Sequence, residues 1–350
     1  MLLYIGVATF LFLGYFYKKD RLWYIFSLLL LFCFSAFRDL SLGGWDAKYY
    51  SDYYYSVPPL TAYNGFQSKY EIGYTLFNSF LKIFSGSYAF FQIVYTAVTL
   101  FLLHIVINKL EFNDSEKCLF LFVYFCYRYI WNTWVLLRQN FANLIVWMLI
   151  FSVFSLKGKK WIGVFIAIII SALFHSTAIF NLILFPFMLL IKKVNPKIIL
   201  IFTTILSIIL YFFGSTYMEK IFEIVTRFAG DRFEKYANDD AGINAVNLLL
   251  RLSVMWLIGL NIERINYKYI KEVFVAIAIS VVLGSINVSI VVRFYEYYAI
   301  GVYVGIVTLI KIFRKKDSAM IAIGIYLLMV IILIRYLQVG FYDGAYRLLF

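Results

Sequence analysis

Apolar segments recur along the whole chain, each about 16 to 21 residues long, and polar connections separate them. A helix of that length matches the hydrocarbon thickness of a bilayer, so each segment predicts a membrane-spanning helix. The predicted spans are residues 2–17, 22–37, 88–108, 118–136, 139–156, 161–175, 176–191, 197–213, 246–262, 272–290, 294–312 and 319–338. The pattern therefore predicts an all-α polytopic membrane protein of about 12 transmembrane helices, with residues 1–350 as a single integral membrane domain.

The polar connections alternate between lysine-rich and lysine-poor ones. The lysine-rich clusters are Lys18, Lys19 and Arg21; Lys109 and Lys117; Lys157, Lys159 and Lys160; Lys192, Lys193 and Lys197; Arg264, Lys268 and Lys271; and Lys311, Arg314, Lys315 and Lys316. Positively charged connections remain in the cytoplasm, so we expect these clusters to face inward and both termini to lie on the periplasmic or extracellular side. Residues 1–17 lack a basic start and a small-residue cleavage site, which favours a retained first helix over a signal peptide.

The composition supports the same class of protein. Of the 350 residues 63% are hydrophobic, and the mean hydropathy is +0.84, whereas a soluble domain needs more polar surface. The net charge of +13 is divided among short clusters, which disfavours a nucleic-acid partner. Cys33, Cys118 and Cys126 lie within apolar segments and indicate neither a disulfide framework nor a zinc site.

Arginine is concentrated on the predicted outer side, whereas lysine predominates inside. The planar arginine fork binds phosphate or carboxylate with two hydrogen bonds, so the outer face is typical of an anion site. Arg128 lies within a span, and Arg138, Arg251 and Arg293 lie near outer helix ends. A charge inside a span costs about 2.5–3.5 kcal/mol, so such residues usually face protein or water. Structural ion pairs, such as Arg293 with Glu296, and anchors at the membrane surface are the alternatives for each arginine alone.

Two predicted outward connections are long, and long loops are usually functional or disordered. Residues 38–87 are rich in tyrosine and include a moderately apolar stretch, 72–84, which predicts a short or re-entrant helix. Residues 214–245 form the second loop and carry mixed charge. The tyrosines are suited to stacking on sugars, although aromatic residues also populate membrane interfaces.

Two further residues are candidates for chemistry. His175 lies at the outer end of a predicted span, where an imidazole can act as a general base or bind an anion; a histidine hydrogen-bonded within the bundle is the structural alternative. Asp46 follows the turn Gly43-Gly44-Trp45, which sets a carboxylate beside an aromatic plane. His104 is assigned a structural role. The chain has no Walker A loop, GxGxxG, HExxH or Asp-x-Asp motif, which disfavours direct use of ATP or a nucleotide-activated donor.

Several short motifs occur in order along the chain. They are Phe37-Arg38-Asp39; Gly44-Trp45-Asp46 with Tyr49-Tyr50; Tyr70-Glu71-Ile72-Gly73-Tyr74; Arg138-Gln139-Asn140-Phe141-Ala142; Ala172-Leu173-Phe174-His175-Ser176; Arg293-Phe294-Tyr295; and Tyr346-Arg347. This ordered set resembles the EpsG family of Wzy-type polysaccharide polymerases over nearly the whole chain. Phe141 stands where a small aliphatic residue is expected, a departure that leaves the charged positions unchanged.

The resemblance implies a GT-C-like polymerase architecture and a glycosyltransferase that uses no metal and no cofactor. Such enzymes join oligosaccharide repeat units carried on undecaprenyl pyrophosphate, at the outer face of the bacterial inner membrane. Donor and acceptor are then lipid-linked oligosaccharides within the membrane lipids, and a chain-length regulator is a further expected partner. The polymer is O-antigen, capsule or exopolysaccharide, which the sequence does not distinguish.

The implied reaction assigns roles to the residues described above. Preorganised arginine would stabilise the leaving pyrophosphate, and the assigned residues are Arg38, Arg138 and Arg293, with Arg128 and Arg251 behind them. The candidates for the base that accepts the hydroxyl proton are His175, Asp46 and Glu71, in that order. The residues assigned to sugar binding are Trp45, Tyr49, Tyr50, Tyr74 and Gln139.

Other functions use related chemistry. A flippase or transporter for lipid-linked oligosaccharides needs cationic residues through the whole depth of the bundle, whereas the cytoplasmic halves of the predicted spans are almost free of charge. An O-antigen ligase would use the same donor with another acceptor. A membrane acyltransferase would need a buried nucleophile or a second histidine facing its donor, and His104 is too far from His175 for that role. The sequence distinguishes neither the repeat-unit sugars nor the linkage, its anomeric outcome or the oligomeric state.

Overall fold

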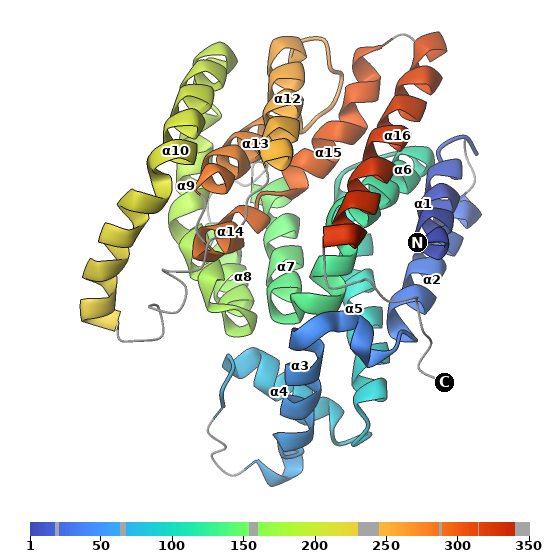
Figure 1. The fold of residues 1–350 in the computed structure, drawn as a ribbon, viewed down its shortest axis with the longest axis vertical. Helices are drawn as coiled ribbons and strands as arrows, with labels where there is room; N and C mark the ends of the chain where they lie inside the picture. The colour runs from blue at the N-terminus through green and yellow to red at the C-terminus, as the bar shows by residue number, and fades with distance from the viewer. Residues whose placement is uncertain are drawn as a thin grey trace. The chain divides into compact units, whose positions relative to one another are not determined.

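The computed structural model (Figure 1) describes residues 1–17, 21–63, 68–153, 160–229, 245–286, 289–313 and 315–339. Most of these described residues are helical and none of them forms a β-strand, which confirms the all-α class. The α-helices are α1 (Leu2–Leu13), α2 (Arg21–Ala36), α3 (Gly44–Ser56), α4 (Ile72–Leu81), α5 (Tyr88–Lys109), α6 (Asp114–Tyr124), α7 (Leu137–Val153), α8 (Lys160–Phe174), α9 (Asn181–Ile191), α10 (Pro196–Ala229), α12 (Ala245–Asn261), α13 (Ile270–Ser285), α14 (Ser289–Glu296), α15 (Ile300–Leu309) and α16 (Lys315–Val339).

Three described helices are long and apolar enough to cross a membrane, and they make the chain a membrane protein. These segments are Tyr88–Lys109, Pro196–Gly214 and Asp317–Gln338. Shorter apolar helices of 10–17 residues are Leu2–Leu13, Arg21–Ala36, Trp161–Phe174, Ser176–Ile191, Ala245–Asn261 and Ile300–Ile312. The count of 12 spans and the sides of the termini stay predictions.

Contacts group the chain into two compact units, and the expectation of a single integral membrane domain stays a prediction. Unit 1 contains Met1–Leu149, Lys159–Ser176 and Ala319–Phe350. Unit 2 contains Ile150–Gly158 and Thr177–Ser318. The motif residues around Glu71, Arg138 and His175 therefore all belong to unit 1.

The expected outward loops contain more helix than the pattern suggested. Within 38–87 the chain forms α3, a 3₁₀ turn at Leu60–Ala62, and α4, which lies where a short helix was expected. Helix α10 continues to Ala229, so residues 214–229 are helical rather than the start of a loop. Residues 230–244 lie outside the described part of the chain. The apolar part of this helix ends at Gly214, close to the predicted end of the span at residue 213, and the polar residues that follow continue the helix because polar side chains do not break it.

An aromatic core fixes α3 and α4 to the first half of α5. Tyr50, Tyr53, Tyr54 and Val57 recur at the spacing of one helix face, so α3 buries a single stripe. The aromatic core comprises Tyr50, Tyr53, Tyr54, Tyr74, Tyr88, Phe91 and Tyr95. Its rings meet mostly edge-to-face or offset, as between Tyr50 and Tyr74 at 5.8 Å, a geometry favoured by the ring quadrupole.

Lys82 closes the C-terminal end of α3. Its Nζ donates to the carbonyl oxygens of Tyr54 at 3.0 Å, Tyr55 at 2.6 Å and Val57 at 2.6 Å. These carbonyls have no partner inside the helix, and a cation at this end also complements the helix dipole. Burial lowers the pKa of the Lys82 ammonium. The lysine thus ties the end of α4 to the end of α3.

Unit 2 is packed around α13 by small residues. A Cβ at Gly301 would lie 2.8 Å from both the Cβ of Ala276 and the backbone nitrogen of Ile277, so α15 and α13 approach closely. Close approach through glycine is a common way to pack helices in membranes. An ion pair between Lys192 and the buried Glu272 joins α9 to α13.

Candidate functional site

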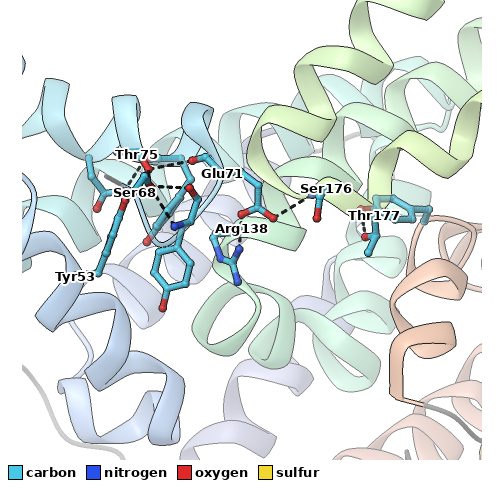
Figure 2. Close-up of polar contacts among 11 residues, drawn as sticks. Tyr53, Ser68, Glu71, Thr75, Arg138, Ser176 and Thr177 are labelled. Atoms are coloured by element: carbon cyan, nitrogen blue, oxygen red, sulfur yellow. Dashed lines mark hydrogen bonds and ion pairs between the residues drawn. The ribbon is translucent and has the colours of Figure 1, made fainter. Parts of the chain in front are cut away.

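An ion pair joins two parts of unit 1 that are distant in sequence. Arg138, in the first turn of α7, donates from Nη1 to Oε2 of Glu71, the N-cap residue of α4 (Figure 2). The side chains are 19% and 18% exposed, respectively, so the pair is sheltered but still reachable. A hydrogen bond between two charged partners is short and strong. The pair connects the motif at Tyr70-Glu71 with the motif at Arg138-Gln139.

The second carboxylate oxygen of Glu71 reaches a third motif. Its Oε1 accepts a hydrogen bond of 3.1 Å from the backbone N–H of Ser176, just beyond the end of α8 (Figure 2). His175 precedes Ser176 and is 4% exposed. Its charge also acts on Glu71. We refer to Tyr70, Glu71, Arg138 and His175 as the Glu71 cluster.

Helix α4 can reach the end of α8 because residue 73 has no side chain. A Cβ at Gly73 would lie 2.7 Å from the carbonyl oxygen of Leu173 and 2.9 Å from its Cβ. Real Cβ atoms do not approach backbone this closely, so any other residue would push the helices apart. Gly73 therefore brings Glu71 within hydrogen-bonding distance of Ser176.

A network of hydroxyl groups holds the backbone that presents Glu71 (Figure 2). The Tyr53 hydroxyl lies 2.7 Å from Ser68 Oγ and 2.6 Å from Thr75 Oγ1. Ser68 Oγ donates to the carbonyl oxygen of Tyr70 at 2.6 Å. Thr75 Oγ1 donates to the carbonyl oxygen of Glu71 at 3.1 Å. These bonds fix residues 68–71 before α4 begins, so the carboxylate of Glu71 is held from both sides.

Aromatic rings surround the guanidinium of Arg138. Its Cζ lies 4.2 Å from the ring centroid of Tyr70, a cation–π contact that leaves the edge of the guanidinium to the carboxylate. Tyr50 is a further hydrogen-bonding neighbour of Arg138. Behind it, the Tyr95 hydroxyl donates to the carbonyl oxygen of Leu137 at 2.9 Å. The arginine is thus held on rigid elements.

The cluster keeps Glu71 ionised. Burial alone would raise the pKa of the Glu71 carboxyl, but the charges of Arg138 and His175 and the N–H of Ser176 together hold that pKa below its ordinary value. Burial and the neighbouring Tyr50 raise the pKa of the Tyr70 hydroxyl to about 12, and Arg138 opposes them. At neutral pH Glu71 is therefore a carboxylate, and Tyr70 is a neutral hydrogen-bond donor.

Two of the predicted site residues lie open at the surface near this cluster. Asp46, in the first turn of α3, is exposed, and its charge acts on the Tyr70 hydroxyl. Tyr49 is exposed, and Lys69 Nζ lies 5.6 Å from its ring centroid. The side chain of Trp45 lies outside the described part of the structure.

Six predicted site residues are buried, which changes what they can contact. Arg38 is 1% exposed, donates to the carbonyl oxygen of Ser35 at 2.6 Å and lies 5.1 Å from the Trp134 ring centroid. The other buried site residues are Tyr50, Tyr74, Gln139, His175 and Arg251. Tyr74 is packed inside the aromatic core, and its assignment to sugar binding stays a prediction. A pyrophosphate could reach Arg38 only if the surrounding helices moved.

The remaining predicted arginines occupy other surroundings. Arg128 lies in a π-helical turn, Phe125–Tyr129, with its Cζ 5.6 Å from the Trp131 ring centroid. Arg251 and Arg293 belong to unit 2. Buried Arg251 lies over the Tyr295 ring at 4.2 Å and beside Gly284, where a Cβ would be 2.3 Å from its Nη1. The structure places Arg251 and Arg293 in unit 2 and the Glu71 cluster in unit 1.

Sequence reasoning did not assign a role to several residues that shape the site. Tyr70 and Gly73 stand inside a quoted motif, but an aromatic ring under an arginine and a helix contact at a glycine are visible only in three dimensions. Ser68 and Thr75 carry no sequence signal for their hydroxyl network. The spacing Ser68, Glu71, Thr75 would have suggested a stabilised helix start and nothing more.

The fold and this cluster define an all-helical membrane protein with an arginine–carboxylate site built from three separate motifs. The chain belongs to the EpsG family, whose family model matches residues 21–348, and this family comprises Wzy-type polymerase-like proteins. Comparisons with the curated proteins and with the solved structures gave no match. Membership supports a polymerase-type function in exopolysaccharide synthesis.

Proposed function

We propose that this protein is a polysaccharide polymerase that joins undecaprenyl-pyrophosphate-linked oligosaccharide repeat units at the outer face of the bacterial inner membrane. One observation carries the proposal. Three motifs of an EpsG-family chain meet in the Glu71 cluster, where an accessible arginine is held beside a carboxylate and a histidine.

In the proposed step the acceptor sugar hydroxyl attacks the anomeric carbon of the donor chain. The new bond joins the hydroxyl oxygen to that carbon, and the bond between the carbon and the pyrophosphate oxygen breaks with its electron pair on the pyrophosphate. Arg138 stabilises this developing charge, because a guanidinium fixed in advance costs no reorganisation during the reaction. The sequence-based assignments of Arg38, Arg128, Arg251 and Arg293 to pyrophosphate binding stay predictions.

The hydroxyl proton needs an acceptor. Glu71 is ionised and already holds Arg138 and the end of α8, so we assign it to positioning. His175 is then the first candidate for the base, and Asp46 at the open surface is the second. Trp45 and Tyr49 are the proposed sugar contacts, with the neutral hydroxyl of Tyr70 as an additional donor.

The test uses purified protein and lipid-linked repeat units with no nucleotide added. A ladder of products spaced by one repeat unit is the expected result. A single transfer to another acceptor without a ladder would identify a ligase instead. Movement of the lipid-linked unit across a vesicle membrane without chain growth would identify a flippase, and either result overturns the proposal.

A further inference from the structure

A polar pocket lies in unit 1, at the other end of α5 from the aromatic core. It has a volume of about 510 Å³ and opens between the start of α2, the end of α5 and the start of α6. The 22 residues of α5 make a helix about 33 Å long, so this pocket is well separated from the residues at its first turns. Arg21 and Lys117 both line this pocket. Each belongs to a lysine-rich cluster that so far served only to predict the topology.

Hydrogen bonds in the pocket join His104 to two neighbours. The Asn108 side-chain nitrogen lies 2.8 Å from Nε2, and the Tyr24 hydroxyl lies 3.0 Å from Nδ1. In the tautomer with its proton on Nδ1, His104 accepts from the Asn108 amide at Nε2 and donates from Nδ1 to the Tyr24 oxygen. The hydroxyl proton of Tyr24 is then available to a ligand.

The charges of the lining favour an anion. Among the described lining residues, Arg21 and Lys117 contribute two cations and Asp114 contributes one carboxylate. Lys117 Nζ lies 3.1 Å from Asp114 Oδ1 and 5.3 Å from the Tyr24 ring centroid, which holds the ammonium over the pocket. An ammonium keeps further donors when one is bound to a carboxylate. Guanidinium, ammonium, hydroxyl and amide N–H together make a donor set suited to a phosphoryl group.

An apolar surface continues from this pocket along α2. Ile25 lines the pocket and is exposed. Leu22, Phe26 and Leu29 are also exposed and lie at helical spacings of three or four residues from Ile25 or from one another. A ligand with a phosphoryl head in the pocket would therefore have a path for an acyl chain.

We propose that this pocket binds a phosphoryl group, and that the group belongs to an anionic lipid headgroup whose chain follows the exposed side of α2. Arg21 and Lys117 neutralise the phosphoryl charge, and Tyr24, set by His104 and Asn108, donates to an oxygen. The inference does not rest on the proposed polymerase activity.

The test measures lipid retention by the full-length protein. Nanodiscs of phosphatidylcholine with a minor fraction of phosphatidylglycerol are used for reconstitution, and the retained lipid is counted by native mass spectrometry. Arg21→Gln, Lys117→Gln and Tyr24→Phe should each reduce retained phosphatidylglycerol at least five-fold. Lys109→Gln removes a charge from the same end of α5 without lining the pocket and should leave retention unchanged.

A second arm titrates inorganic phosphate into the detergent-purified protein by calorimetry. We expect weak or undetectable binding. Phosphate binding that is lost in Arg21→Gln, with no lipid preference, would overturn the lipid assignment and keep the phosphoryl site. Equal effects of Lys109→Gln and Lys117→Gln, or no effect of Tyr24→Phe, would overturn the site itself. Tyr24→Phe removes a single hydroxyl, so it decides the matter if a charge variant fails to fold.

Discussion

At the scale of single residues, the site depends on how Glu71 and Arg138 divide their interactions. In the ion pair, each side chain uses only part of its hydrogen-bonding capacity, and each side chain is nearly a fifth exposed. The carboxylate also accepts from Ser176, and the guanidinium also lies on Tyr70. The ion pair therefore connects α4 to α7, and it also leaves the guanidinium of Arg138 partly exposed to a ligand. Removing one partner leaves the other partly buried and unpaired, which costs more than the pair contributes.

A double-mutant cycle tests this connection. Glu71→Gln and Arg138→Gln should each lower the free energy of unfolding by about 1–3 kcal/mol, and the double variant should lose much less than the sum, because the second change removes a charge already unpaired. Thermal unfolding in detergent measures these losses. Asp114→Asn breaks the more exposed pair with Lys117 and serves as a control, with an expected loss under about 1 kcal/mol. Additive losses at residues 71 and 138 would contradict the pairing.

The lowered pKa of Glu71 predicts a pH dependence of stability. A carboxyl whose pKa is lower in the folded state stabilises the fold fully above its unfolded pKa, about 4.3, and this stabilisation is lost as the pH falls through the folded value. Wild-type protein should therefore lose stability on going from about pH 5 to pH 3 more steeply than Glu71→Gln. Unfolding temperatures measured across this range provide the comparison. Parallel curves would show that Glu71 is not held in its ionised form by the fold.

At the scale of the elements, a glycine and an aromatic stripe decide where the charged residues lie. The stripe on α3 anchors α4 through the aromatic core, and Gly73 then lets α4 contact the end of α8. Together these contacts bring Glu71, the N-cap residue of α4, to the end of α8. A change in the spacing between α4 and α8 would therefore move the carboxylate without altering any charged residue.

Gly73→Ala tests this dependence. The added Cβ would meet the Leu173 backbone at 2.7 Å, so the helices must separate, at a cost of about 1–3 kcal/mol and with a loss of activity of at least ten-fold. Gly163→Ala, in α8, is the matched control, because nothing lies within 4 Å of its Cβ and alanine favours helix by about 1 kcal/mol. Unfolding temperature and product ladders measure both effects. Equal behaviour of the two variants would show that the contact does not position Glu71.

The sequence predicts some elements of the fold and some residues of the site better than others. The hydrophobic pattern predicted the all-α class and the helical position of α5 and α16, since apolar length is a strong local signal. It also predicted the apolar part of α10, which ends at Gly214, but not the polar continuation of that helix to Ala229, because polar helix carries no apolar signal. The ordered motifs indicated Glu71, Arg138 and His175, but their pairing depends on long-range contacts. The aromatic ring of Tyr74 is suited to stacking on a sugar, and only the packing of the fold shows that Tyr74 lies in the aromatic core.

At the scale of the whole molecule, the two units divide the predicted arginines between them. Unit 1 contains the Glu71 cluster and the phosphoryl pocket at the two ends of α5, and unit 2 contains Arg251 and Arg293. The lysine clusters predict that the pocket end of α5 faces the cytoplasm, and therefore that the Glu71 cluster faces outward. The side of the membrane that each end of α5 faces can be tested in one experiment.

Cysteine labelling tests this orientation. In a variant whose three native cysteines are replaced, Ser56→Cys at the end of α3 should react with a membrane-impermeant maleimide on intact cells. Lys109→Cys at the end of α5 should react only after permeabilisation. The opposite pattern would invert the topology, and labelling of both on intact cells would show that α5 does not cross the membrane.

The most direct test of the proposed activity compares two arginines in the polymerisation assay with lipid-linked repeat units. Arg138→Ala removes the guanidinium of the Glu71 cluster and should reduce chain lengthening at least 100-fold, while the folded protein is still recovered. Arg264→Ala removes an exposed arginine from a lysine-rich connection and should leave the ladder unchanged. A full ladder from Arg138→Ala would contradict the assignment of this site to the leaving pyrophosphate.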